Sequence, residues 1–277
     1  MSRLAVRKTY KLWIGGAFVR SESGRHDHAV QADGAQVNIP RASRKDVRDA
    51  VAAARKAQGP WAARTAYNRG QILYRAAEAL ESRTDQLAAV SDRGQVQDAV
   101  DVLVHYAGWT DKLHAVLGGV NPVAAPFLSF SVPEPTGVVG VVAPDGPALL
   151  GLVAELAPAL AAGNTVVAIL SEPHPLAGLD LAEVLGVSDI PGGVVNLLSG
   201  RRSELAPALG AHRDLNAIVD VSGDSELAAE LDRLAAETIK RARHGAAVTG
   251  YDTAIADALE RLDGLSELKT AWHPIGA

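Results

Sequence analysis

Few residues of this 277-residue chain have the types and the spacing that chemistry requires. The chain contains no cysteine, which excludes a thiolate nucleophile, a disulfide and a thiolate metal site. Asp145 and Glu172 follow two predicted strands and could approach one another as an acid pair for hydrolysis. Carboxylates near strand ends more often cap helices or face solvent, so we expect no catalytic residue in this chain.

The histidines give no indication of a metal site. Metal-binding motifs place histidines at fixed short spacings, as in HExxH, and that motif does not occur here. The sequence therefore predicts no metal. The scattered histidines include His105, His114, His174, His212, His244 and His273.

Charge and hydropathy exclude two classes of partner. The net charge of −5 and the pI near 5.9 leave no excess of basic residues to neutralise phosphates, so we expect neither nucleic acids nor membranes as partners. The longest apolar stretch, residues 148–162, contains Glu155 and Pro158 and is too short to cross a bilayer. Basic residues interrupt the first apolar run before it reaches the length of a signal peptide, so we expect a cytoplasmic protein.

The first part of the chain predicts a hairpin followed by helices. Residues 10–14 and 17–20 are β-rich on either side of a Gly-Gly turn. Ser43 and Asp46 form a capping-box signal for a helix that stops at Gly59. Apolar spacing predicts helices over residues 66–83 and 96–117, with a short one capped by Thr84 between them. In the last helix, Tyr106 and Trp109 belong to the core or, alternatively, to an interface patch.

The second part of the chain alternates strands with helices. Strands are predicted over residues 137–143, 165–169, 194–198 and 217–221, and helices over residues 149–162, 176–185, 204–209 and 225–243. Right-handed crossovers between such strands give the doubly wound parallel sheet of an α/β protein. On the last helix, Glu237 and Arg241 are expected to pair one turn apart.

Other segments flank this alternation. Residues 127–132 predict an exposed or edge strand between prolines. Residues 245–250 are rich in glycine and predict a linker, which a helix over residues 253–262 and a final strand over residues 265–272 follow.

Three segments occur in linked order through the alternating region: EPTGVVGVVAP (residues 134–144), LAPALAAGNTVV (156–167) and PGGVVNLLSG (191–200). Together they resemble the cofactor domain of the aldehyde dehydrogenase superfamily. The hairpin YKLWIGGAFV (10–19) and the strand LSELKTAW (265–272) also resemble family segments, the latter the C-terminal oligomerisation strand. HYAGWTDK (105–112) and EVLGVSDIPGGVVNLLSGR (183–201) are most similar to the degenerate C-terminal domain of the sixteenth aldehyde dehydrogenase family, here as a free-standing chain.

The resemblance implies a fold and a division into domains. It implies a Rossmann-type doubly wound parallel sheet with a small β oligomerisation flap, and it implies that the catalytic domain is missing. Residues 1–126 and 134–243 would form the NAD(P)-binding-type domain, and residues 127–133 and 265–277 the flap. Residues 244–264 would be a linker and short helix in place of the catalytic domain.

The resemblance also implies which site residues persist. The family's nucleophilic cysteine and its general-base glutamate have no counterpart, so the chain is expected to be inactive alone. Vestigial cofactor-binding positions are Pro144, Glu172 and Gly200, while Ile169 stands where the family has its ribose-binding lysine. The family's pyrophosphate-binding turn aligns loosely with residues 220–223, where Asp220 would repel a phosphate. We expect no cofactor, with NAD or NADP as the alternative.

The expected function follows from the family segments that this chain retains. The oligomerisation strands would leave unpaired edges in water, which predicts a partner. We expect a pseudoenzyme subunit that supports or regulates a full-length aldehyde dehydrogenase subunit in a hetero-oligomer, with a homodimer as an alternative assembly. A dinucleotide-binding sensor or a residual NAD(P)-linked oxidoreductase is the alternative function. The residues predicted to form the partner interface are Phe127, Phe130, Val132, Leu268 and Trp272.

Overall fold

A seven-stranded sheet lies at the centre of the molecule, in the order β11-β10-β7-β8-β9-β1-β2. The computed structural model describes residues 8–275. Strands β7 to β11 run parallel, and β1 pairs antiparallel with both β9 and β2. The strands of this sheet are β1 (Leu12–Ile14), β2 (Ala17–Val19), β7 (Val138–Val142), β8 (Thr165–Ile169), β9 (Val195–Leu198), β10 (Ala217–Asp220) and β11 (Arg241–His244).

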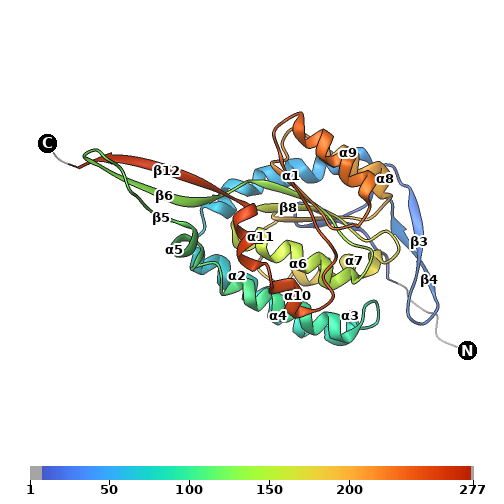
Figure 1. Cartoon of the computed structure of the whole chain (residues 1–277). Coiled ribbons are helices and arrows are strands. Elements are labelled where there is room, and N and C mark those ends of the chain that lie inside the picture. The colour runs from blue at the N-terminus through green and yellow to red at the C-terminus, as the bar shows by residue number, and fades with distance from the viewer. Residues whose placement is uncertain (1–7, 276–277) are drawn as a thin grey trace, which may run out of the picture.

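Helices cover both faces of the sheet (Figure 1). One face carries α1 (Arg44–Ala62), α8 (Arg202–Gly210) and α9 (Ser225–Ala236). The other face carries the longer helices α2 (Ala66–Glu81), α4 (Arg93–Ala107), α6 (Ala148–Ala161) and α7 (Pro175–Leu185), and the short helices α3 (Thr84–Leu87), α10 (Tyr251–Ile255) and α11 (Ala258–Gly264). Every residue of β7 and β8 is buried, because parallel strands between two helical layers have no face in water. The predicted α/β doubly wound fold is thereby confirmed.

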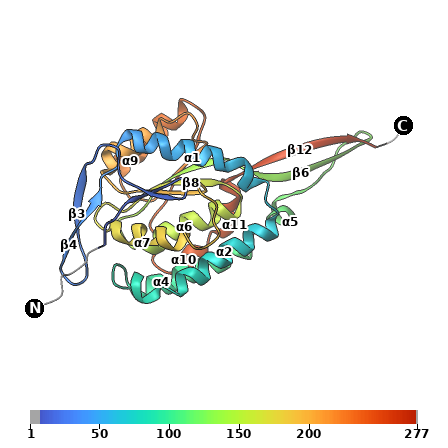
Figure 2. The ribbon, with the colours of Figure 1, turned by 180° about the vertical axis from the view of Figure 1, so that it is seen from behind.

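Two smaller sheets extend from this body. The hairpin of β3 (His26–Val30) and β4 (Gln36–Pro40) lies at one end, where no strand was predicted. At the other end, β5 (Gly119–Asn121), β6 (Phe127–Pro135) and β12 (Ser266–Pro274) form an arm that projects away from the helices, with α5 (Leu113–Leu117) at its base (Figure 2). We call this three-stranded sheet the β arm.

Several predicted elements have the wrong boundaries or type. The predicted 225–243 helix ends at Ala236, and its last residues form β11, because Ile239 adopts a positive φ of 56° and the free edge of β10 offers a parallel partner. The Glu237–Arg241 pair is therefore wrong, and Arg241 instead contacts Glu267 at 2.8 Å.

Three further predictions also fail in detail. The predicted 96–117 helix divides into α4 and α5, because the chain leaves the helix at Gly108. Of the two aromatic residues in this region, Tyr106 is fully buried and Trp109 is half-buried. The helix that was to stop at Gly59 continues to Ala62. The single predicted 253–262 helix is two helices, α10 and α11.

The strand over residues 127–132 was predicted to be exposed or an edge strand; Phe127 and Leu128 are exposed, but the edge position is wrong. This strand is part of β6, the middle strand of the β arm, between β5 and β12. β12 and β5 are the two edges, since each pairs with β6 on one side only.

The connection from β11 to β12 is packed into the core. Val248, Ala254, Ala258, Leu262 and Leu265 are all buried in it. The Tyr106 hydroxyl on α4 donates a 3.4 Å hydrogen bond to the Ala254 carbonyl oxygen of α10. Residues 245–265 thus cover α4 and α6 where these helices would otherwise face solvent.

Candidate functional site

The three predicted cofactor-binding residues lie at the carboxyl ends of adjacent strands, but they face different surroundings. Pro144 follows β7 and is buried against Gly151 of α6, where a Cβ atom would lie 2.3 Å from its ring. Gly200 follows β9 with a φ of 154° and packs against Ala42. A Cβ atom added at Gly200 would lie 3.1 Å from the Ala42 nitrogen. Glu172 follows β8 and is the one of the three that lines a cavity.

Glu172 is held by two consecutive residues at the start of α8. Its Oε1 accepts a hydrogen bond of 2.8 Å from Arg201 Nη1, and its Oε2 accepts one of 2.9 Å from the Arg202 backbone nitrogen. A helix N-terminus exposes unpaired N–H groups and a partial positive charge, which a carboxylate stabilises. Glu172 therefore caps α8 from a neighbouring strand end.

Asp145 is held by the side chain of Arg202. The Arg202 guanidinium forms an ion pair with the Asp145 carboxylate and donates a 3.3 Å hydrogen bond from Nη2 to the Ala143 carbonyl oxygen. Asp145 and Glu172 thus each pair with an arginine side chain, and the alternative of a hydrolytic acid pair has no support in this geometry.

The cavity beside these residues is acidic. It has a volume of about 330 Å³ and is lined by Glu172, Arg202, Ser203, Asp224, Glu226, Leu227 and Glu230. Four of these side chains are carboxylates, and the one arginine already pairs with Asp145. A dianionic pyrophosphate would meet a field of the wrong sign at this position.

The start of α9 is also closed to an anion. Asp224 accepts hydrogen bonds of 3.0 and 3.1 Å from the backbone nitrogens of Glu226 and Leu227, the amides that an anion at this helix N-terminus would use. Asp220, expected to repel a phosphate, is buried and accepts a bond of 2.9 Å from the Ser222 nitrogen. The residues present at this edge of the sheet therefore do not fit a dinucleotide.

The five predicted interface residues lie on the β arm, divided between its two faces. The register of β6 and β12 places Phe127, Leu268 and Trp272 on one face and Phe130 and Val132 on the other. Phe127, Leu268 and Trp272 are 37%, 56% and 59% exposed, and the rings of Phe127 and Trp272 meet edge to face at 6.0 Å. Phe130 and Val132 are half-buried. The arm thus presents apolar side chains to solvent on both faces.

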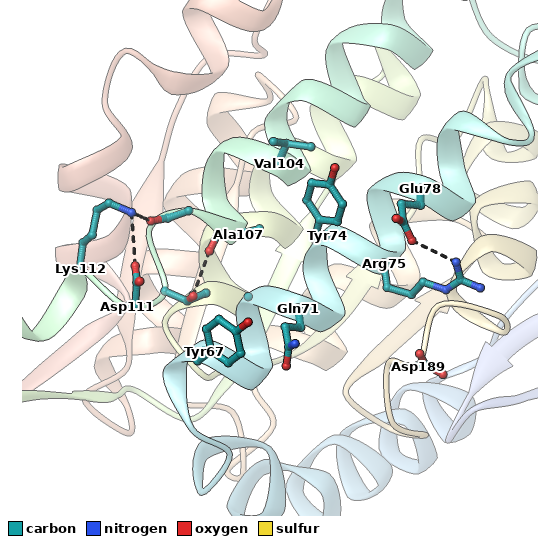
Figure 3. A pocket seen from close by; sticks show the side chains of 13 residues that line it. Tyr67, Gln71, Tyr74, Arg75, Glu78, Val104, Ala107, Asp111, Lys112 and Asp189 are labelled. Atoms are coloured by element: carbon teal, nitrogen blue, oxygen red, sulfur yellow. Dashed lines mark hydrogen bonds and ion pairs between the residues drawn. The ribbon is translucent and has the colours of Figure 1, made fainter.

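Sequence reasoning missed a cavity that lies between α2 and the end of α4 (Figure 3). Its volume is about 630 Å³, and Tyr67 and Tyr74 of α2 line it. The spacing of two exposed tyrosines seven residues apart is a signal that could have indicated it. Its charged side chains pair locally, Arg75 with Glu78 at 3.0 Å and Lys112 with Asp111 at 3.3 Å, and they form no catalytic arrangement.

Among residues 8–275, no group of three or more histidine, aspartate or glutamate side chains is placed to hold a metal ion. No helix in that part of the chain is long and apolar enough to cross a membrane.

Comparison with known proteins identifies the family. The family model described as "Aldehyde dehydrogenase family" matches residues 18–255. An aldehyde dehydrogenase of Emericella nidulans is 33% identical over 220 residues, which are 75% of this chain and 44% of that protein. The cytosolic 10-formyltetrahydrofolate dehydrogenase of Mus musculus is 35% identical over 237 residues, 79% of this chain and 26% of that protein.

Solved structures indicate the same family. The structure of an aldehyde dehydrogenase of Bacillus cereus in complex with NAD+ matches with a TM-score of 0.80 and 28% identity, covering 86% of this chain and 50% of that one. HpcC of Thermus thermophilus matches with a TM-score of 0.81 and 30% identity, covering 86% and 48%. The chain spans about half the length of the aldehyde dehydrogenases it matches, as expected if the catalytic domain is missing. This chain belongs to the aldehyde dehydrogenase family.

Proposed function

We propose that this chain is a non-catalytic member of the aldehyde dehydrogenase family that associates with a complete NAD(P)-dependent aldehyde dehydrogenase subunit and supports or regulates it. The β arm is the observation that carries the proposal. It projects from the body, and β12 leaves one backbone edge unpaired along its length. β12 also exposes Leu268 and Trp272, and an edge strand with unpaired backbone groups and exposed apolar side chains is a place where a partner can add a strand.

Two features of the body favour a non-catalytic role. The chain has no cysteine, so it cannot form the thiohemiacetal from which the family's chemistry starts. Asp145 and Glu172, two carboxylates at the carboxyl edge of the sheet, each form an ion pair with an arginine of this chain.

The test is isolation of the tagged chain from its native host, with sizing of what co-purifies and an assay of aldehyde-dependent NADH formation in the same fraction. We expect a full-length aldehyde dehydrogenase in fixed ratio, with activity that changes when this chain is removed. A purified chain that stays a monomer and ignores every intact homologue from its own cell would contradict the proposal.

A matched pair of variants separates the β arm from general surface effects. Trp272→Arg places a charge among exposed apolar side chains of the arm and should abolish co-purification. Val30→Arg changes a side chain that is 67% exposed on the β3–β4 hairpin, at the opposite end of the molecule, and should leave co-purification intact.

The alternative function, a dinucleotide-binding sensor, draws on one observation, the NAD+ complex of the Bacillus cereus relative. Saturable binding of NAD+ or NADP+ by the isolated chain, together with recovery of a homo-oligomer only, would favour this alternative over the proposed subunit.

A further inference from the structure

Arg202 contacts residues that follow the ends of two neighbouring strands, β7 and β8. Arg202 is the first residue of α8, and its side chain is 13% exposed. Its Nη2 donates a 3.3 Å hydrogen bond to the carbonyl oxygen of Ala143, which follows β7. Arg202 also forms an ion pair with Asp145. The backbone nitrogen of the same residue binds Glu172 beyond β8. One residue therefore joins the ends of β7 and β8 to α8.

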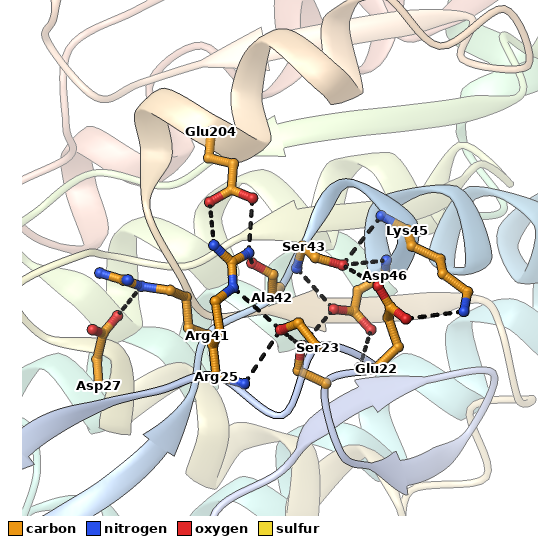
Figure 4. Close-up of polar contacts among 11 residues, drawn as sticks. Glu22, Ser23, Arg25, Asp27, Arg41, Ala42, Ser43, Lys45, Asp46 and Glu204 are labelled. Atoms are coloured by element: carbon orange, nitrogen blue, oxygen red, sulfur yellow. Dashed lines mark hydrogen bonds and ion pairs between the residues drawn. The ribbon is translucent and has the colours of Figure 1, made fainter.

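The start of α8 also forms ion pairs with residues 25 and 27, and Figure 4 shows the one between Arg25 and Glu204. Arg25 donates two hydrogen bonds to Glu204, of 2.8 and 3.1 Å, in the forked geometry that fixes both side chains. Arg201 lies 3.6 Å from Asp27 as well as 2.8 Å from Glu172. The first turn of α8 is thus fixed both to the strand ends and to the segment that leads into the β3–β4 hairpin.

These contacts give Glu172 a role other than binding a sugar. Both of its carboxylate oxygens accept hydrogen bonds from within the chain, one from a backbone amide at a helix N-terminus. The α9 amides are likewise satisfied by Asp224. Positions that would hold an anionic ligand are therefore filled by the chain's own side chains.

We infer that Arg202, Asp145 and Glu172 form an internal clasp that takes the place of a bound dinucleotide, joining the ends of β7 and β8 to α8 so that the folded chain gains no stability from NAD+ or NADP+. The inference is independent of the proposed partner, because it concerns the isolated chain alone.

The first test is thermal unfolding of the purified chain with and without millimolar NAD+ or NADP+. A ligand that binds the folded state raises its melting temperature by mass action. We expect no shift with either dinucleotide. A saturable rise with either one overturns the inference.

The second test is a double-mutant cycle on the clasp. Arg202→Ala should lower the melting temperature by about 4–8 °C, because it removes an ion pair and leaves Asp145 without its partner. Once Asp145 has also been changed to Ala, the arginine substitution should cost clearly less, since coupled residues are not additive. Additive effects of the two changes would overturn the clasp.

Two further variants keep the cycle interpretable. Arg233→Ala removes an exposed arginine 3.9 Å from Glu230 on α9 and should shift the melting temperature by less than about 2 °C. If Arg202→Ala does not fold, Arg202→Lys with Asp145→Asn forms the same cycle. Lysine keeps the charge but lacks the planar fork that reaches Ala143 and Asp145 together, so the same non-additivity is expected.

Discussion

Glu155, in the middle of α6, forms a buried ion pair with Arg261 of α11. The Glu155 side chain is 2% exposed and also pairs with Arg243 at the end of β11. Two ends of the connection between β11 and β12 are thereby tied to one carboxylate in the core. This arrangement explains why the connection packs as part of the body.

Replacing Glu155 with Ala should strongly destabilise the fold. The change leaves two arginines close together without their shared carboxylate, and an uncompensated buried charge costs about 3–5 kcal/mol. Urea unfolding gives the change in free energy. Glu230→Ala, which removes an exposed carboxylate from α9, is the control and should cost less than about 1 kcal/mol. A similar small loss for Glu155→Ala would show that the ion pairs do not hold the connection.

The start of α1 depends on Asp46. Its carboxylate accepts hydrogen bonds from the Ser43 nitrogen at 2.8 Å, the Ser21 hydroxyl at 2.8 Å and the Glu22 nitrogen at 3.2 Å (Figure 4). Asp46→Ala should destabilise the fold by about 2–3 kcal/mol in urea unfolding, because buried donors lose their acceptor. Asp49→Ala, one turn later and exposed, should change stability by less than about 0.5 kcal/mol. Equal effects would argue against the capping box.

The turn between β1 and β2 requires glycine for two separate reasons. Gly16 has a φ of 82°, and a Cβ there would lie 2.5 Å from the Gly192 Cα atom. Gly34 has a φ of 79° but no atom within 4 Å of the added Cβ. Both alanine variants should lose about 1 kcal/mol for the left-handed backbone.

Only Gly16→Ala must also separate two backbone segments, and we expect it to lose at least about 2 kcal/mol more than Gly34→Ala. Chemical denaturation of the two variants in parallel isolates this difference. Equal stabilities of the two variants would mean that the backbone at Gly16 does not approach Gly192 as described.

Alkaline pH should destabilise the protein through Tyr106. Burial raises the pKa of Tyr106 to about 12, from 10.0. Because the folded pKa is above the unfolded one, this group's contribution is fully present below pH 10 and is lost as the pH rises towards about 12. The loss amounts to about 2–3 kcal/mol.

The measurement is unfolding free energy against pH for the native chain and Tyr106→Phe. The phenylalanine variant should be the less stable at neutral pH, where it lacks the bond to Ala254, and should gain on the native chain above about pH 10. Tyr67→Phe removes a hydroxyl from a ring that is 69% exposed and serves as the matched control. Parallel pH profiles for the native chain and Tyr106→Phe would refute the assignment.

Local sequence signals determined much of the fold. Ser43 and Asp46 cap α1 as their spacing predicts, since a capping box needs only residues three apart. Gly163 has the positive φ of 92° that ends α6 and lets β8 begin, and the β-branched runs of β7 and β8 are buried throughout. The linked order of these segments also identified the family, which the family model confirms.

Tertiary structure decided the elements whose conformation depends on distant partners. Residues 241–244 form a strand because the edge of β10 is available, and residues 127–135 lie in the middle of a sheet because β12 reaches them from the far end of the chain. The same holds for the candidate site. Glu172 could be located at a strand end from sequence, but its pairing with Arg201 and Arg202 depends on the packing of α8 against two strand ends, which no local pattern encodes.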